Sequence, residues 1–153
     1  MAEYYFEELN VQSLRDSVIL LDIDGTLVPD NAVLVTLPAL KKLEELKEHN
    51  TVYLCTNSRN RPRCKEIERI TKTSIINPDC KKPSRRVLQC LPTEFSQQPV
   101  TVIGDKFLTD ALFAKRIGAQ FIRVKRKHGK DRPIIKIINA VDDVMFRLFN
   151  HYL

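Results

Sequence analysis

Tryptophan is absent from this chain, glycine occurs only four times, and none of the four cysteines belongs to a CxxC pair. With aromatic residues at only 7%, the chain lacks the interleaved aromatic surface typical of single-stranded nucleic-acid binding. Scarce glycine and the lack of a Ser/Gly-rich linker argue against a second domain. Because 153 residues suffice for one hydrophobic core, we expect a single domain over residues 1–153.

Long apolar runs and targeting signals are also missing. No run approaches the roughly 20 apolar residues that a membrane-spanning helix needs. The first eight residues are acidic, and they lack both the basic and apolar regions of a secretory signal and the arginines of a transit peptide. The cysteines, partly in apolar runs, are typical of reduced, buried thiols. We therefore expect an intracellular, reducing compartment, either cytoplasmic or organellar (mitochondrial), with peripheral membrane association as an option and without a transmembrane segment.

Basic residues exceed acidic ones, and the net charge is +6. They concentrate around residues 59–72, 81–86 and 123–136. A positive field attracts phosphoesters, nucleic acid or an anionic membrane. A solvated, lysine-rich surface would give the same composition, so charge by itself leaves the partner open.

Short apolar runs alternate with stretches of helical periodicity. The predicted strands are Val18–Asp22, Val52–Cys55, Ser74–Ile76, Val100–Ile103 and Phe121–Val124. The predicted helices are Pro38–Glu48, Arg61–Thr71, Ser84–Leu91, Leu108–Ile117 and Ile134–Phe149. This alternation predicts an α/β fold: one three-layer, Rossmann-like domain with a parallel sheet of about five strands. Ligands of such sheets bind at the carboxyl ends of the strands.

The most informative segment is Asp-Ile-Asp-Gly-Thr at residues 22–26, directly after the first apolar run. Strand alternation would point Asp22 and Asp24 in the same direction, and unpaired charges are costly away from water. Carboxylates gathered at a strand end suit a hard cation such as Mg²⁺. The segment therefore predicts a metal-assisted site in which one aspartate is the nucleophile and the other an acid/base.

Polar residues also follow the other predicted strands. Thr56 and Asn57 follow the second strand, where they suit phosphate oxygens or, equally, a turn or helix cap. Lys82 precedes a proline after the third strand and could point into the crevice or lie on the surface. Asp105 and Asp110 form a second acidic cluster after the fourth strand, although Asp110 could simply favour a helix start.

In the order Asp-x-Asp-Gly-Thr, Thr, Lys and Gly-Asp-x4-Asp, these pieces resemble the haloacid dehalogenase (HAD) superfamily of phosphohydrolases, from Val18 to about Val124. The resemblance implies that Asp22 is the nucleophile, forms an aspartyl-phosphate and binds Mg²⁺. It implies that Asp24 protonates the leaving alcohol and then activates water, with its backbone carbonyl on the metal. The other implied roles are phosphate binding by Thr56, Asn57 and Lys82, metal binding by Asp105, and support from Thr26 and Asp110.

The spacing leaves no room for a cap domain, since 25 residues separate Thr56 from Lys82. The run Gly-Asp-x-Phe-Leu-Thr-Asp at 104–110, continuing to Arg116-Ile117-Gly118, is similar to a capless class III branch. That branch contains YqeG-like proteins and mitochondrial phosphatidylglycerophosphate phosphatases. The resemblance therefore implies removal of the terminal phosphate from phosphatidylglycerophosphate, a step of phospholipid metabolism that could take place at a membrane surface. Lys106 and Lys115 stand where the branch usually has glutamine and asparagine, and Gly25 stands where it usually has asparagine.

An uncapped site also suits a phosphoprotein, a nucleic-acid 3′-phosphate, or a small sugar phosphate enclosed by oligomerisation, and a non-catalytic HAD-like binding protein is the alternative of another class. The stripe Val141, Val144, Met145, Leu148, Phe149 and Tyr152 is expected to pack on the core. The alternative is peripheral membrane contact, assisted by Tyr4, Tyr5 and Phe6. Arg59, Arg61 and Arg63 could bind a second phosphate or lie in solvent.

Overall fold

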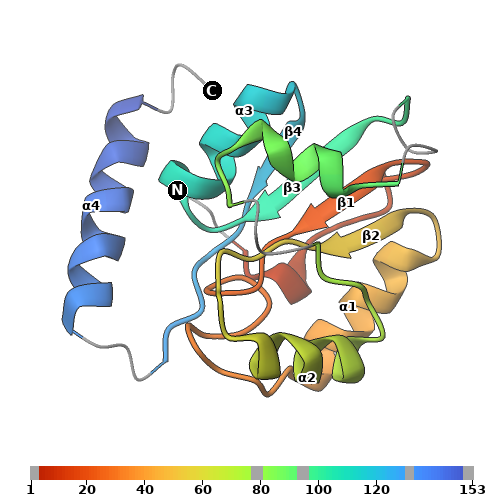
Figure 1. Ribbon diagram of the computed structural model, residues 1–153, viewed down its shortest axis with the longest axis horizontal. Helices are drawn as coiled ribbons and strands as arrows, with labels where there is room; N and C mark the ends of the chain where they lie inside the picture. The colour runs from red at the N-terminus through yellow and green to blue at the C-terminus, as the bar shows by residue number, and fades with distance from the viewer. Residues whose placement is uncertain (1–3, 77–80, 93–96, 130–132, 150–153) are drawn as a thin grey trace.

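The computed structural model describes residues 4–76, 81–92, 97–129 and 133–149. At its centre is a parallel sheet in the order β2-β1-β3-β4 (Figure 1). The strands are β1 Val18–Leu21, β2 Thr51–Leu54, β3 Val100–Gly104 and β4 Gln120–Arg123. The predicted α/β class and parallel sheet are therefore confirmed.

The predicted strand at Ser74–Ile76 is reduced to a single bridge beside β2. The N–H of Leu54 donates to the Ser74 carbonyl at 2.9 Å, and the N–H of Ile76 donates to the Leu54 carbonyl at 2.8 Å. Two residues beyond Ile76 the sequence has Pro78, which has no N–H to donate to a strand ladder. The part of the chain that the structure describes thus contains four strands instead of about five.

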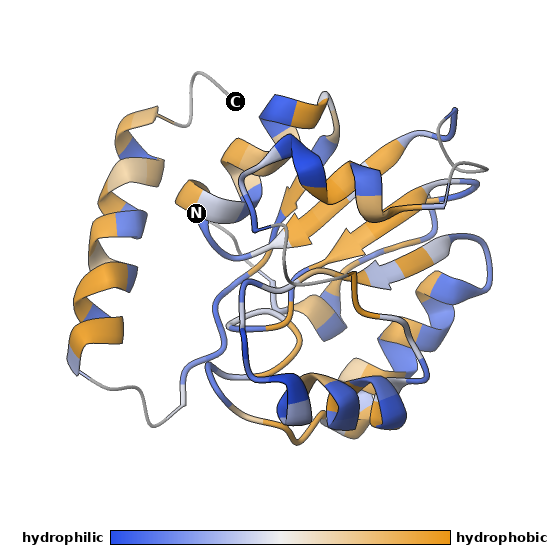
Figure 2. Cartoon of the chain, in the orientation of Figure 1, coloured by the Kyte–Doolittle hydropathy of each residue, from blue (hydrophilic) through white to orange (hydrophobic). Residues whose placement is uncertain are grey.

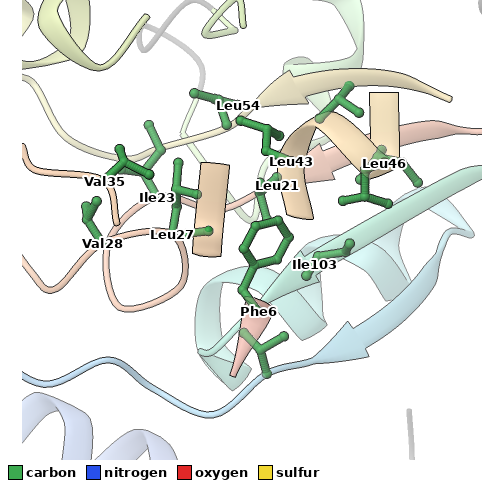
Figure 3. Close-up of a cluster of buried hydrophobic side chains, with 14 of the residues drawn as sticks. Phe6, Leu21, Ile23, Leu27, Val28, Val35, Leu43, Leu46, Leu54 and Ile103 are labelled. Atoms are coloured by element: carbon green, nitrogen blue, oxygen red, sulfur yellow. The ribbon is translucent and has the colours of Figure 1, made fainter. Parts of the chain in front are cut away.

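Helices flank the sheet on both sides. Their bounds are η1 Phe6–Glu8, α1 Leu37–Lys47, α2 Arg61–Thr71, η2 Arg85–Cys90, η4 Phe107–Ala111, α3 Leu112–Ile117 and α4 Pro133–Phe149. Ile19 and Leu21 of β1 pack with residues of α1 and α2 in one hydrophobic cluster. Figure 3 shows Leu21 of this cluster with Leu43 and Leu46 of α1. Val18 and Leu20 pack with η2 and α3 in a second cluster. Because neighbouring residues of a strand face opposite sides, a sheet buried on both faces gives the three predicted layers.

Two predicted helices differ in type. The segment predicted as a helix at Ser84–Leu91 forms the 3₁₀ helix η2, in which Val87 is buried and Leu88 packs beside it. The predicted helix Leu108–Ile117 begins as the π turn η4 before continuing as α3. The N–H groups of Asp110 and Ala111 both donate to the carbonyl of Lys106, at 3.0 and 3.2 Å. Such π turns often occur at functional sites.

Helix α4 stands at the edge of the molecule, on the side toward which the strand arrows point (Figure 1). The expectation that its apolar stripe packs on the core is wrong for Val141, Val144 and Leu148, which are 51%, 53% and 62% exposed. Tyr152 lies outside the described residues. Phe6, expected as a membrane-contacting residue if the stripe met a bilayer, is fully buried in the core.

No cap domain interrupts the described part of the sheet. A loop alone connects β1 to α1, and α2 with the Ile75 bridge occupies the described part of the segment between Thr56 and Lys82. Among the described helices, none is both long and apolar enough to cross a bilayer. The carboxyl edge of the sheet is therefore left open for the site.

Candidate active site

The parallel register places the carboxyl ends of three strands side by side. Leu21, the last residue of β1, pairs with Leu54 of β2 and Ile103 of β3. Asp22 therefore emerges between the segments that carry Thr56 and Asp105. The candidate residues predicted to follow the strands lie at this edge of the sheet.

Lys82 is the buried centre of the site. Its ammonium lies 2.5 Å from a carboxylate oxygen of Asp22 and 2.5 Å from one of Asp110. All three residues are at most 6% exposed. Burial by itself would lower the pKa of Lys82, but Asp110 and Asp22 outweigh burial and raise it well above its usual range. Lys82 is thus a fixed positive charge at the carboxyl edge of the sheet.

Asn57 and Arg116 hold the backbone around Lys82. The N–H of Lys82 donates to Asn57 Oδ1 at 2.8 Å, and Asn57 Nδ2 donates to the Lys82 carbonyl at 2.9 Å. Arg116 donates to the carbonyl of Pro83 at 3.2 Å. Asn57 was predicted as a phosphate ligand, and the structure uses both ends of its amide to position the lysine.

Asp22 is a destabilised carboxylate. Burial raises its pKa from 3.8 to about 8, and the negative charges of Asp110 and Asp105 act in the same direction against the opposing charge of Lys82. One oxygen accepts from Lys82, and the buried Oδ2 has no hydrogen-bond partner. An unpaired buried acceptor is costly unless a cation or donor satisfies it.

A group of three buried carboxylates could hold a metal ion. Among the described residues, one oxygen each from Asp22, Asp105 and Asp110 lies within 4.8 Å of the others. Thr26 orients Asp105 by donating to its Oδ1 at 3.2 Å. Gly25, at φ 89°, leaves the space that the Asp105 carboxylate occupies, because a Cβ there would lie 2.7 Å from Asp105 Oδ2. Asp110, predicted only as a supporting residue, belongs to this carboxylate cluster.

The metal contact predicted for Asp24 was through its backbone carbonyl only, and its carboxylate lies apart from the three clustered carboxylates. It lies 2.8 Å from Arg63 Nη2 and accepts from Thr56 Oγ1 at 3.0 Å. Burial would raise its pKa, but Arg63, with Asn31 and Thr56, lowers it instead. The chain leaves the strand after Leu21, so strand alternation does not extend to Asp24. Arg63 itself is buried, and it neither lies in solvent nor extends toward a second phosphate.

Two basic residues were not predicted as parts of the site. Lys106, noted only as a departure from the family pattern, donates to the Asp24 carbonyl and to Asp30, both at 3.3 Å. Arg126 binds Asp105 Oδ2 at 2.5 Å. The concentration of basic residues at 123–136 was visible in the sequence, but nothing there indicated that Arg126 would be buried beside an acidic cluster.

The site opens into a cleft of about 470 Å³. Its polar lining includes Asp22, Asp24, Lys82 and Lys106, and helix α4 contributes Ile135, Ile138 and Asn139 as one wall. A buried nucleophile candidate, a fixed lysine and a carboxylate cluster at the end of a parallel α/β sheet define a phosphatase of the HAD-like class. The geometry fits transfer of a phosphoryl group to a carboxylate.

Comparison with known families gives the particular assignment. Residues 5–128 match the family described as mitochondrial PGP phosphatase, where PGP is phosphatidylglycerophosphate. The chain therefore belongs to this family, and it is a phosphoric monoester hydrolase. A search of curated proteins finds no match.

Proposed function

We propose that this phosphatase removes the terminal phosphate of phosphatidylglycerophosphate, using Mg²⁺ and an aspartyl-phosphate on Asp22. The family description names the substrate class, and an uncapped cleft suits a headgroup attached to a large lipid. The observation that carries the proposal is the Asp22 carboxylate, which is buried with one oxygen on Lys82 and the other without a partner. A family with a mitochondrial member also supports an organellar location for this chain.

The residues at the carboxyl edge fit Mg²⁺. Asp22, Asp105 and Asp110 would hold it through hard oxygen donors, and the unpaired Oδ2 of Asp22 is an available ligand atom. When bound, Mg²⁺ supplies positive charge that offsets the repulsion between a carboxylate nucleophile and a phosphate dianion. Lys82 adds a positive charge of its own, and the Thr56 hydroxyl, which donates to Asp24 in the free enzyme, would turn to a phosphate oxygen when substrate binds.

In the first step, an oxygen of Asp22 attacks phosphorus while the bond from phosphorus to the glycerol oxygen breaks. Asp24 in its acid form gives its proton to that departing oxygen, and phosphatidylglycerol leaves. Arg63 keeps the pKa of Asp24 low in the free enzyme. A phosphate dianion in the cleft raises that pKa again, because a nearby negative charge favours the neutral acid. Substrate binding thereby loads the proton that the first step uses.

In the second step, the Asp24 carboxylate takes a proton from water as the water oxygen attacks the phosphorus of the aspartyl-phosphate. The bond from phosphorus to Asp22 breaks, inorganic phosphate leaves, and Asp24 is protonated again. Covalent catalysis divides one difficult displacement into two easier ones. The low pKa of Asp24 suits this step, in which it must start as a carboxylate.

The test is phosphate release from a panel of phosphatidylglycerophosphate in detergent micelles, phosphopeptide, 3′-phosphorylated oligonucleotide and sugar phosphate, with and without Mg²⁺. We expect turnover of the lipid, its loss on chelation, and a fall of at least about a thousandfold in Asp22→Asn. Asp16→Asn is a matched control, since Asp16 is an exposed carboxylate and its φ of 53° suits asparagine.

Activity that survives in Asp22→Asn would refute the nucleophile. Turnover confined to one of the other substrates would replace the lipid with that substrate. If no substrate reacted with wild-type protein while Mg²⁺ still bound, a non-catalytic binding role would take the place of the proposal.

A further inference from the structure

Helix α4 faces the rest of the protein with its polar side. Asp142 accepts from the N–H groups of Phe107 and Leu108, both at 2.8 Å. Asn139 and Asp142 are 5% and 2% exposed. One turn further toward the C-terminus of α4, the Phe146 ring meets the Phe107 ring edge-on, with the ring centroids 6.0 Å apart. The helix is therefore anchored through hydrogen bonds and through the contacts of Phe146 and Phe149 with Phe107.

The apolar side of α4 faces away from the protein. We use "outer face" for its six aliphatic residues that are 51–62% exposed: Ile134, Ile137, Ile138, Val141, Val144 and Leu148. Their spacing places them on one side of the helix. Figure 2 shows α4 as a largely hydrophobic ribbon that the other helices and the sheet leave uncovered. Contiguous apolar surface of this kind marks an interaction site.

The charges beside the outer face indicate the chemistry of what covers it. Lys136 and Arg147 are the exposed charged residues of α4, and Asp143 is paired with Arg123 at 3.0 Å. Lys125, in the segment leading to the helix, is exposed as well. Long basic side chains that flank an aliphatic face are typical of helices that lie in the interface of an anionic bilayer. There the aliphatic groups enter the acyl boundary and the ammonium and guanidinium groups meet lipid phosphates.

The outer face is continuous with the catalytic cleft. Ile138 belongs to both, since it lines the cleft beside Asp22 and is 52% exposed on the outer face. Seventeen residues of helix extend for about 25 Å along this surface. A phosphate that enters the cleft past Ile138 therefore comes from the same side as whatever binds the outer face.

We propose that α4 lies in the interface of an anionic bilayer, with its outer face inserted and the cleft held at the level of the headgroups. The inference rests on the proposed function for its account of why the cleft faces lipid. The partner is the membrane surface itself, recognised by aliphatic insertion and by negative charge.

The test is co-sedimentation of the full chain with vesicles that contain no phosphomonoester lipid. Phosphatidylcholine vesicles with added phosphatidylglycerol are compared with phosphatidylcholine vesicles alone. The main variant is Ile137→Ser/Val144→Ser/Leu148→Ser, and Leu37→Ser is the matched control because Leu37 is 73% exposed on a different helix. A second variant, Lys136→Gln/Arg147→Gln, tests the charge. None of these residues lines the cleft.

We expect wild-type protein and Leu37→Ser to bind the anionic vesicles. The triple serine variant should bind at least about tenfold more weakly, and the double glutamine variant about tenfold more weakly on the anionic vesicles. Hydrolysis of a soluble aryl phosphate and the circular dichroism spectrum should stay unchanged, which shows that the variants are folded. The proposal would be overturned if the triple serine variant bound the anionic vesicles as tightly as wild type. It would also be overturned if Leu37→Ser lost as much vesicle binding as the triple variant.

Two further outcomes separate this inference from the proposed function. Sedimentation velocity without lipid would overturn the inference if wild-type protein formed a dimer that the triple variant did not form, because the occupant would then be a second copy. Vesicle binding by Asp22→Asn equal to that of wild type supports the inference, whatever the phosphatase assay shows. Lipid turnover without any vesicle binding would refute the inference and leave the proposed function intact.

Discussion

Replacing Asp22 with asparagine should make the metal-free protein more stable while it abolishes activity. The folded state holds this carboxyl at a pKa of about 8, whereas the unfolded chain holds it near 3.8. Between these values the folded state binds more protons than the unfolded one, so stability falls as pH rises from about 4 to about 8. Asparagine has the same shape and no charge to bury, so Asp22→Asn removes this loss.

The size of the effect follows from the two pKa values. A tenfold change in a protonation equilibrium is worth about 1.4 kcal/mol, so the interval from 3.8 to about 8 sets an upper bound of about 6 kcal/mol. Asparagine also gives up the ion pair with Lys82, which then keeps Asp110 alone. We expect a net gain of about 2 kcal/mol at pH 8, or about 4–8 °C in Tm for a domain of this size.

Thermal unfolding of wild type and Asp22→Asn at pH 8 and pH 5, with a chelator present, measures the difference. The gain should shrink at pH 5, where the folded wild type holds Asp22 protonated. Added Mg²⁺ should raise the Tm of wild type toward that of the variant, because an ion that binds only the folded state stabilises it. A variant no more stable than wild type at pH 8, or a gain independent of pH, would refute the argument.

Three further substitutions test the surrounding residues. Arg63→Met should cost about 3 kcal/mol in urea unfolding near neutral pH and raise the pKa of Asp24, moving the acid limb of the pH–rate profile upward. The difference in stability between wild type and Arg63→Met should become smaller as pH falls through the low pKa of Asp24, because protonated Asp24 no longer pairs with Arg63. If the acid limb of the pH–rate profile did not move in Arg63→Met, the role of Arg63 would be contradicted. Lys106→Gln should lower the Mg²⁺ concentration for half-maximal thermal stabilisation about tenfold, since it removes a positive charge from the acidic site; unchanged affinity would argue against this. Gly104→Ala places a Cβ 2.5 Å from Asp110 Cγ, so we expect a loss of about 1–3 kcal/mol and a fall in kcat at unchanged KM.

The sheet and the edge that carries the site could be predicted from the sequence because both depend on local patterns. The apolar run before Asp22 specifies a buried strand, and a parallel sheet brings strand ends together wherever the polar residues stand in the chain. The predicted strand at Ser74–Ile76 forms only the bridge between Ile75 and Leu54, and the nearby Pro78 has no N–H with which to continue a ladder.

Interactions between residues distant in the chain could not be read in the same way. Arg63 and Asp24 are 39 residues apart, and Arg126 and Asp105 are 21 apart. The hydrophobic periodicity of the sequence does not indicate which arginine of a basic stretch will be buried against a carboxylate. The prediction that the apolar stripe of α4 packs on the core was wrong for the same reason. An amphipathic pattern shows that a helix has an apolar face, but it does not show what covers that face.

The two hydrogen bonds that Asp142 accepts have a mechanical consequence. If α4 swung away, the N–H groups of Phe107 and Leu108 would exchange the Asp142 carboxylate for water, and losing a hydrogen bond to a charged group costs about 1.5–3 kcal/mol. Both donors belong to the turn that carries Asp110, so the helix and the carboxylate cluster form one stiff unit. Helix α4 is then held at a fixed position relative to the turn that carries Asp110, and it does not act as a hinged lid. The proposed contact of α4 with a bilayer would therefore hold Asp22 at a fixed distance from the lipid surface, a distance set by the fold itself.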